Sequence, residues 1–278
     1  MNILNLVSQL APLVPDDSAP EWMVGLFRRR SISFASGLSD SDTRVFWMQS
    51  FGLTIDLRLP LEYEPAESDA DEEAWYAHSV WDGNHLSWHG GISNLSENRW
   101  PEPAELRRVG NCMVEFAPSG IYVEDWRLQN MRPGPLIALE VLYERDLTTG
   151  QNREVEGALI LAGDYLGSVL QSPRGFEACI AVCEQSGTES TEFVVQHSLQ
   201  SRLCGLPFKD IDGFFLTDKQ GEVAQRLETE DGPVERVYRI DTLLESFDFS
   251  QSTQATPDAE TWYGKHQPTL GRYLRRFR

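Results

Sequence analysis

The chain has 278 residues, of which 41% are hydrophobic and 24% are charged. This composition supports a buried core and argues against a wholly disordered, collagen-like or coiled-coil chain. The formal net charge of −19 argues against binding nucleic acid by neutralising phosphates, and against docking on anionic membranes through a basic face.

The N-terminal segment predicts a short helix followed by a linker. Apolar residues recur at helical spacing within residues 2–10, and Pro12 and Pro15 end the run. The start lacks a basic n-region and the chain lacks an apolar run of 18 residues, so we expect neither a signal peptide nor a transmembrane helix. Four cysteines are too few for a disulfide scaffold, and we expect a cytoplasmic protein with reduced thiols.

From residue 22 onward the pattern changes to strands. Residues 22–34, 44–50 and 51–59 are extended, and the last of these alternates strictly, which is typical of a strand with one buried face. Its apolar face carries Leu53, Ile55, Leu57 and Leu59. Its other face carries Thr54, Asp56 and Arg58.

An acidic run and a hairpin follow. The carboxylates within residues 62–73 repel one another, so this stretch is expected to be a solvated, mobile loop rather than a metal site. Residues 74–89 predict a hairpin that turns at Asp82-Gly83-Asn84, because an Asp-Gly pair favours a tight turn between strands.

The rest of the chain continues as short strands with little helix. Further strands are expected at residues 111–117, 120–128, 135–144, 154–162, 164–171, 176–184, 191–199, 213–217 and 234–240. Short helical turns are expected at residues 101–108 and 241–247, a loose tail at 250–258 and an aromatic, basic end at 262–278. Strands spaced by roughly 8 to 12 residues are typical of antiparallel sandwiches and barrels.

The two halves share a pattern that suggests an internal duplication. Aromatic-Arg pairs start at Phe27 and Trp126, 99 residues apart, and each precedes an extended segment, a turn and two apolar strands. The apolar strands are split by Phe51-Gly52 in one half and by Gly163-Asp164 in the other. A duplication predicts two similar barrels in tandem, with a boundary near residues 118–125.

Two segments also resemble a known family. Residues 51–60 (FGLTIDLRLP) and 85–93 (HLSWHGGIS) are similar to segments of the double-barrel, lipocalin-like (calycin) proteins, whose barrels begin with an aromatic-x-Arg type of strand. The resemblance extends to the second half only by topology. It implies barrels of roughly eight to ten strands that can enclose a cavity. It implies no reaction, since the family has no catalytic constellation to carry over.

We therefore predict an all-β protein of two tandem lipocalin-like antiparallel β-barrels with a short N-terminal helix. One larger barrel or a sandwich is the alternative. The predicted parts are an N-terminal helix and linker at residues 1–20, a first barrel at 21–120, a second barrel at 121–249 and a C-terminal tail at 250–278.

Residue types with catalytic or metal-binding chemistry do not form a motif. His85 and His89 would lie about 13 Å apart along one strand, too far for one ion, and Cys179 and Cys183 share a strand face without touching. The sequence has no nucleophile elbow, phosphate loop or dinucleotide fingerprint. We predict no catalytic residue, no metal and no cofactor, and an enzymatic Asp56–Arg58 site ranks last among the hypotheses.

Tryptophans and arginines are the candidates for a ligand site. Indole rings suit a pocket wall, and arginines that face a lumen suit a carboxylate or phosphate head group. The ligand-binding candidates are Trp47, Trp81, Trp88, Arg28, Arg58 and Arg127. The alternative for the tryptophans is that they form the barrel core.

These features favour a non-enzymatic binding protein that holds a small, partly apolar or amphipathic molecule in a lipocalin-like barrel. The alternative is a protein-interaction scaffold with filled barrels, whose acidic run and basic tail meet a protein partner or a second copy of the chain. The tail is basic through Arg272, Arg275, Arg276 and Arg278. Neither hypothesis involves nucleic acid or a membrane span.

Overall fold

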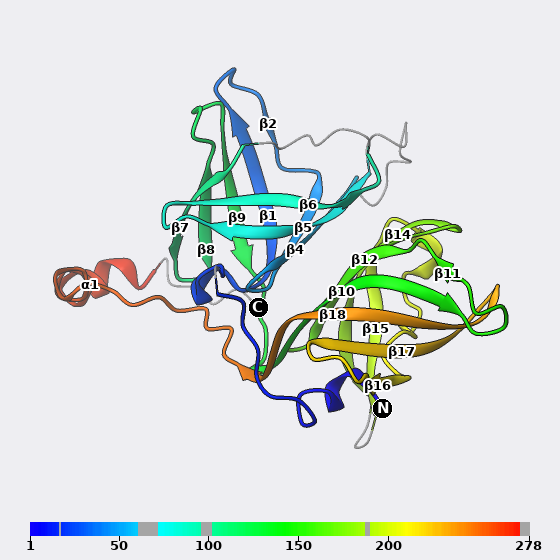
Figure 1. The fold of residues 1–278 in the computed structure, drawn as a ribbon. Coiled ribbons are helices and arrows are strands. Elements are labelled where there is room, and N and C mark those ends of the chain that lie inside the picture. The colour runs from blue at the N-terminus through cyan, green and yellow to red at the C-terminus, as the bar shows by residue number, and fades with distance from the viewer. Residues whose placement is uncertain (17, 61–71, 96–101, 187–189, 273–278) are drawn as a thin grey trace.

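Two antiparallel β-sheets lie side by side in the computed structural model, which describes residues 1–16, 18–60, 72–95, 102–186 and 190–272 (Figure 1). The acidic run falls mostly outside these residues, as do residues 273–278 of the basic tail. The helices of the described residues include none long and apolar enough to cross a membrane.

The first sheet closes into an eight-stranded barrel. Its strands are β1 (Gly25–Phe34), β3 (Arg44–Gln49), β4 (Leu53–Leu59), β5 (Glu73–Trp81), β6 (His85–Ser93), β7 (Ala104–Val109), β8 (Cys112–Phe116) and β9 (Tyr122–Leu128). Each strand pairs with the next, and β9 returns to pair with β1 from Phe27–Leu128 to Phe34–Tyr122. The short β2 (Ser39–Asp40) pairs with Ile32 and Ser33 of β1, beyond the part of β1 that pairs with β3. Because closure removes the edges, every strand of this barrel is paired on both sides.

The second sheet is formed by the C-terminal half. Its strands are β10 (Gly134–Asp146), β11 (Asn152–Arg153), β12 (Glu156–Ala162), β13 (Tyr165–Ser172), β14 (Gly175–Ser186), β15 (Ser190–Ser198), β16 (Phe214–Leu216), β17 (Glu222–Thr229) and β18 (Gly232–Phe247). The order in space runs from β15 through β14, β13, β12, β10, β18 and β17 to β16. Within the described residues β15 and β16 do not pair, so this half is a curved open sheet, whereas the sequence predicted a second closed barrel.

The strand pairings of the first sheet recur in the second. In both halves the first strand pairs with a two-residue strand, with the next long strand and with the last strand of the half. The meander that follows, β3 to β6, corresponds to β12 to β15. The pair β8–β9 likewise corresponds to β17–β18. The repeat is therefore one of strand topology, but it begins at a different residue from the one predicted. Trp126 and Arg127 belong to β9, which closes the first barrel. The second sheet therefore starts at β10 and not at residue 121.

The start of the chain contains less helix than the sequence predicts, and its end contains an α-helix that the sequence did not predict. Residues 2–10 hold only the 3-10 turn η1 (Ile3–Asn5), and a second turn, η2 (Glu21–Met23), precedes β1. The segments 101–108 and 241–247 are strand, because β7 pairs with β8 and the end of β18 pairs with β10. The C-terminal tail instead contains helix α1 (Pro257–Leu270), which Thr256 caps at its N-terminus and which buries none of its side chains.

Strand β4 is buried on both sides and joins the two halves. Thr54, Asp56 and Arg58 face the barrel interior, while Ile55 and its apolar neighbours face the second sheet. Opposite them lies Gly167 on β13, where an added Cβ would come within 2.7 Å of Met48 Sδ and 3.5 Å of Ile55 Cδ1. The close approach of the two halves therefore requires a residue without a side chain at position 167.

Successive side chains along the strands of the second sheet point alternately into two apolar cores. One face packs on the first barrel through Leu136, Ala138, Ala158, Ile160 and Ile180. The other face lines the hollow of the second half with Ile137, Leu139, Leu159, Leu161 and Cys179. This period of two is the strand periodicity that the sequence shows, with both faces buried.

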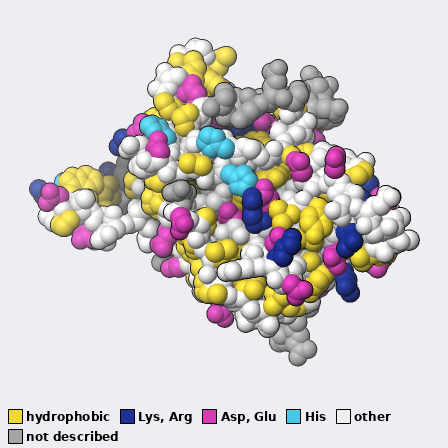
Figure 2. All heavy atoms as spheres, in the orientation of Figure 1, with side chains coloured by type: hydrophobic (Ala, Val, Ile, Leu, Met, Phe, Trp, Pro, Cys, Tyr) yellow, Lys and Arg dark blue, Asp and Glu magenta, His cyan; other side chains and the backbone are white. Residues whose placement is uncertain are grey.

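Both ends of the chain tie the halves together. Leu13 bridges to Leu243 of β18, and six residues later the backbone N–H of Ala19 donates to the carbonyl of Phe51 at 2.8 Å. After β18 the chain returns to the first barrel, where the N–H of Gly110 donates to Thr253 Oγ1 at 3.0 Å. Figure 2 shows acidic side chains scattered over both halves, as the net charge predicts.

The interface predicts a large difference between two glycine substitutions. Gly167→Ala pushes Met48 away and should lower the free energy of unfolding by about 1–3 kcal/mol, the range for overpacking. Gly264→Ala on α1 meets no atom within 4 Å and should leave it unchanged or raise it by up to about 1 kcal/mol. Urea unfolding of both variants measures this, and equal stabilities would refute the tight interface.

Candidate functional site

The interior of the first barrel holds two of the three predicted tryptophans and one of the three predicted arginines. Trp47 lies between Trp126 and Trp88, with ring centroids 5.4 Å and 6.3 Å away. Arg58 lines the same space, which measures only about 20 Å³. A cavity of this size holds little more than one water molecule, so this barrel has no space for the predicted ligand.

Charged side chains fill the rest of this interior. Arg58 Nε lies 2.7 Å from Asp56 Oδ1 and 3.8 Å from Glu73 Oε2, and all three side chains are at least nine-tenths buried. Burial by itself lowers the pKa of Arg58, but the neighbouring carboxylates outweigh burial and raise this pKa. Arg58 is therefore neutralised within the protein and offers no free charge to a ligand head group.

Two carboxyl groups face each other across β8 and β9. Burial raises the pKa of Glu115 well above its usual value, and the nearby Glu124 carboxylate adds to this. Trp126 Nε1 donates to Glu115 Oε2 at 3.0 Å, and Arg29 Nη1 donates to Glu124 Oε1 at 2.9 Å. Its surroundings therefore favour the protonated form of Glu115, which carries no negative charge inside the barrel.

The other predicted ligand residues lie elsewhere. Arg28 is exposed on the outside of β1, 5.8 Å from the ring centroid of Phe46, and the half-buried Arg127 pairs with Asp125 beside it. Trp81 ends β5 at one end of the barrel, where its ring meets Trp22 edge to face. The six predicted residues do not form one site.

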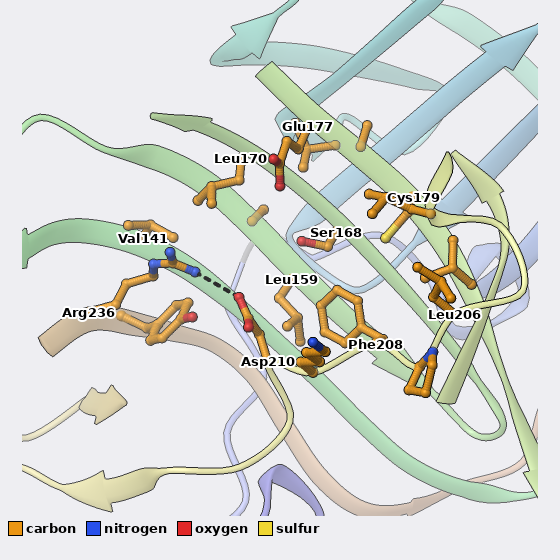
Figure 3. A pocket seen from close by; sticks show the side chains of 18 of the residues that line it. Val141, Leu159, Ser168, Leu170, Glu177, Cys179, Leu206, Phe208, Asp210 and Arg236 are labelled. Carbon is orange, nitrogen blue, oxygen red and sulfur yellow. Dashed lines mark hydrogen bonds and ion pairs between the residues drawn. The ribbon is translucent and has the colours of Figure 1, made fainter. Parts of the chain in front are cut away.

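The second half contains a larger pocket that the sequence analysis missed. It has a volume of about 350 Å³ and lies in the hollow of the curved sheet (Figure 3). Its walls carry apolar side chains from six strands: Val141, Leu159, Leu170, Cys179, Val195 and Tyr238. Ser168 on β13 also points into it, since Gly167 before it faces the first barrel.

Residues 201–210 cover one side of this pocket. They begin with the 3-10 turn η4 (Ser201–Leu203) and run along the outer edge of β15. The N–H of Val195 donates to the carbonyl of Leu206 at 2.9 Å, and the N–H of Phe208 donates to that of Phe193 at 2.7 Å. These hydrogen bonds hold the apolar side chains of Leu206 and Phe208 against the pocket.

The pocket is lined by more cations than anions. Arg236 is buried and lies 2.8 Å from Glu144 Oε2. It also lies 3.4 Å from Asp210 Oδ2 (Figure 3). Arg202 and Lys209 line the pocket from the covering segment and have no ion-pair partner within the described part of the chain. The lining also carries the carboxylate of Glu177, so these two cations leave it with a net positive charge in a protein of net charge −19, which favours an anionic group there.

Two titratable groups on the pocket wall, the Cys179 thiol and the Tyr238 hydroxyl, are held in their neutral forms. Burial raises the pKa of Cys179 to about 12, and burial also raises the pKa of Tyr238 to about 12. The Tyr238 hydroxyl donates to Gln225 Oε1 at 2.7 Å. A thiol with this pKa is hardly ionised near neutral pH and is a poor nucleophile, so this wall suits binding rather than covalent chemistry.

No protein-family model, curated protein or solved structure matches the chain.

The signal for this pocket was present in the sequence but ambiguous. Strands at residues 154–162 and 164–171 were predicted, yet their apolar runs do not show which face lines a hollow. Lys209, one of three lysines in the chain, was not connected to Arg202, because the covering segment has no periodic pattern.

Removing the buried arginine should destabilise the protein strongly. Arg58→Met leaves Asp56 and Glu73 buried without their cation and should lower the free energy of unfolding by about 3–5 kcal/mol. Arg107→Met is the matched control, because Arg107 also pairs with a carboxylate two residues earlier on its strand, but with 74% of its side chain exposed. The control should change stability by no more than about 0.5 kcal/mol. Urea denaturation compares the two, and similar losses would contradict the ion-pair account.

Glu115 should make stability depend on pH. Because its pKa is higher in the folded state, the folded protein binds the proton more tightly, and this contribution to stability falls as pH rises above about 4.5. Glu115→Gln mimics the protonated acid and should flatten this decline above about pH 4.5. Parallel pH profiles for wild type and variant would show instead that Glu115 ionises normally.

Proposed function

We propose that this protein is a non-enzymatic binding protein that holds a small amphipathic anion in the pocket of its second half. The observation that carries the proposal is the combination of an apolar pocket of about 350 Å³ with two cations at its rim, Arg202 and Lys209, that form no ion pair with the residues the structure describes. The neutral state of Cys179 and Tyr238 supports binding without reaction.

The size of the pocket limits the ligand. Taking about 30 Å³ for each water-sized group, it accepts roughly a dozen non-hydrogen atoms, the size of a medium-chain carboxylic acid such as decanoic acid. Each buried methylene contributes about 0.8 kcal/mol, offset by an association cost of at least about 4 kcal/mol. The nine alkyl carbons of decanoate then leave about 3 kcal/mol, and a charge-assisted hydrogen bond to the head group adds about 1.5–3 kcal/mol. We expect a Kd of roughly 0.03–0.3 mM.

The repeated strand pairings support a second, lipocalin-like barrel as the frame of this pocket. In the first barrel β6 pairs directly with β7. We propose that the covering segment, residues 201–210, takes the place of this pairing in the second half, because it runs along β15, the counterpart of β6. On this view the two halves are similar barrels with different contents. One is packed with tryptophans and ion pairs, and the other leaves space for a ligand.

An interaction scaffold is the second candidate function. Helix α1 buries no side chain and exposes 56% of Trp262 and 42% of Tyr263. Figure 1 shows it standing apart from both sheets. Exposed aromatic side chains of this kind are enriched where proteins bind partners.

Filling the pocket should abolish binding of decanoate. Ser168→Leu places a branched side chain inside the hollow and should weaken decanoate at least tenfold, whereas Ser31→Leu, at a half-buried serine of the first barrel, should not. Isothermal titration calorimetry measures both. The described residues of the pocket lining include no tryptophan, so tryptophan emission is expected to change little on binding.

The head group is tested by charge reversal. The double variant Arg202→Glu and Lys209→Glu should weaken decanoate but not decanol, which lacks the charge. The double variant Lys219→Glu and Lys265→Glu, at two exposed positions away from the pocket, is the control for the same change in total charge. Failure of both ligands to bind the wild type, or equal binding by Ser168→Leu, would overturn the proposed function.

A further inference from the structure

A second open groove lies at one end of the first barrel, apart from the pocket of the second half. It has a volume of about 630 Å³ and is lined by Pro20, Trp22, Trp81, Asn84, His85 and Arg107, with Gly83, Glu105 and Leu106 between them. We call it the Trp22–Trp81 groove. Its volume fits about twenty non-hydrogen atoms, the size of a disaccharide.

The aromatic part of the groove is rigid. The rings of Trp22 and Trp81 lie 6.0 Å apart at 88°, so each indole fixes the orientation of the other. Arg108 Nη1 donates to the carbonyl of Trp22 at 2.6 Å, and Arg108 Nε donates to that of Gly110 at 2.7 Å. This cross-link holds the turn that carries Trp22 against the β7–β8 hairpin.

The polar part is equally fixed. Asp82 Oδ1 accepts hydrogen bonds from the backbone N–H groups of Asn84 at 2.8 Å and His85 at 2.7 Å, which locks the β5–β6 turn. His85 pairs in register with Glu105 on β7. The turn and the strand therefore present Asn84, His85 and Glu105 along one rim of the groove.

The chemistry of the rim suits hydroxyl groups. Asn84, His85, Glu105 and Arg107 are planar groups that together supply hydrogen-bond donors and acceptors, as a sugar with many hydroxyls requires. Arg107 and Glu105 pair at 2.7 Å with 74% and 39% of their side chains exposed. Such exposed pairs are weak, so both groups remain available to a ligand.

These features separate the groove from the proposed anion pocket. The formal charges of Glu105 and Arg107 cancel, which favours a neutral ligand. The groove is also open to solvent, so an alkyl chain there would stay in contact with water, whereas the C–H face of a pyranose packs on an indole while its hydroxyls stay hydrated. We propose that the Trp22–Trp81 groove binds a neutral oligosaccharide, with a disaccharide unit in contact.

The test is a glycan array of neutral and acidic oligosaccharides probed with the full chain. Calorimetry with the best neutral binder follows. We expect at least one neutral oligosaccharide to bind with a Kd of about 1 mM or tighter. Trp81→Ala should weaken it at least tenfold. The exposed Arg107→Ala and Asn84→Ala should weaken it severalfold without changing the fold.

Trp262→Ala is the matched control, since it removes an exposed tryptophan from α1 and should leave saccharide binding unchanged. The proposal fails if no saccharide on the array binds, if only acidic ones bind, or if binding survives both Trp81→Ala and Arg107→Ala. Binding of decaproline in place of any saccharide would assign the groove to a proline-rich peptide and equally overturn it. Saccharide binding that persists in Ser168→Leu keeps this site distinct from the pocket of the second half.

Discussion

The burial of β4 on both sides is the constraint on which the rest of the structure depends. Its apolar residues meet Gly167 and Ile160 of the second sheet, so Thr54, Asp56 and Arg58 must lie inside the first barrel. An arginine in that position requires carboxylates around it, and burying those carboxylates costs free energy unless they are paired or protonated. The ion pairs of Arg58 follow from this one strand. The raised pKa of Glu115 follows from its burial beside Glu124, which outweighs the opposing effect of Arg58.

The two halves use the same pairing scheme and fill it differently. At the corner where the first, short and last strands meet, the first barrel places Arg29 of β1 between Asp40 and Glu124. The second half places Glu144 of β10 between Arg153 and Arg236. The charges are exchanged between the strands while the geometry of the corner is kept. What differs is the centre of each half, where indoles close the first barrel and smaller side chains such as Ser168 and Cys179 leave the pocket.

Local patterns predicted the strands better than the site. The alternation at residues 53–59 and the turn at Asp82-Gly83 were sufficient to place β4 and the β5–β6 hairpin. The segment 241–247 was predicted as helix because its own sequence permits it, but pairing with β10 makes it strand. Trp47 and Trp88 do face the barrel interior, yet whether indoles line or fill a space depends on the residues opposite them, which no local pattern contains. The cytoplasmic location and the absence of cofactors stay predictions.

The central claim is that a ligand enters the second half and not the first barrel. A crystal structure of the full chain grown with decanoate tests it most directly. The account predicts electron density among Leu159, Ser168 and Cys179, with the carboxylate toward Arg202 and Lys209. Density between Trp47 and Trp88 of the first barrel, or decanoate only on the outer surface, would contradict it.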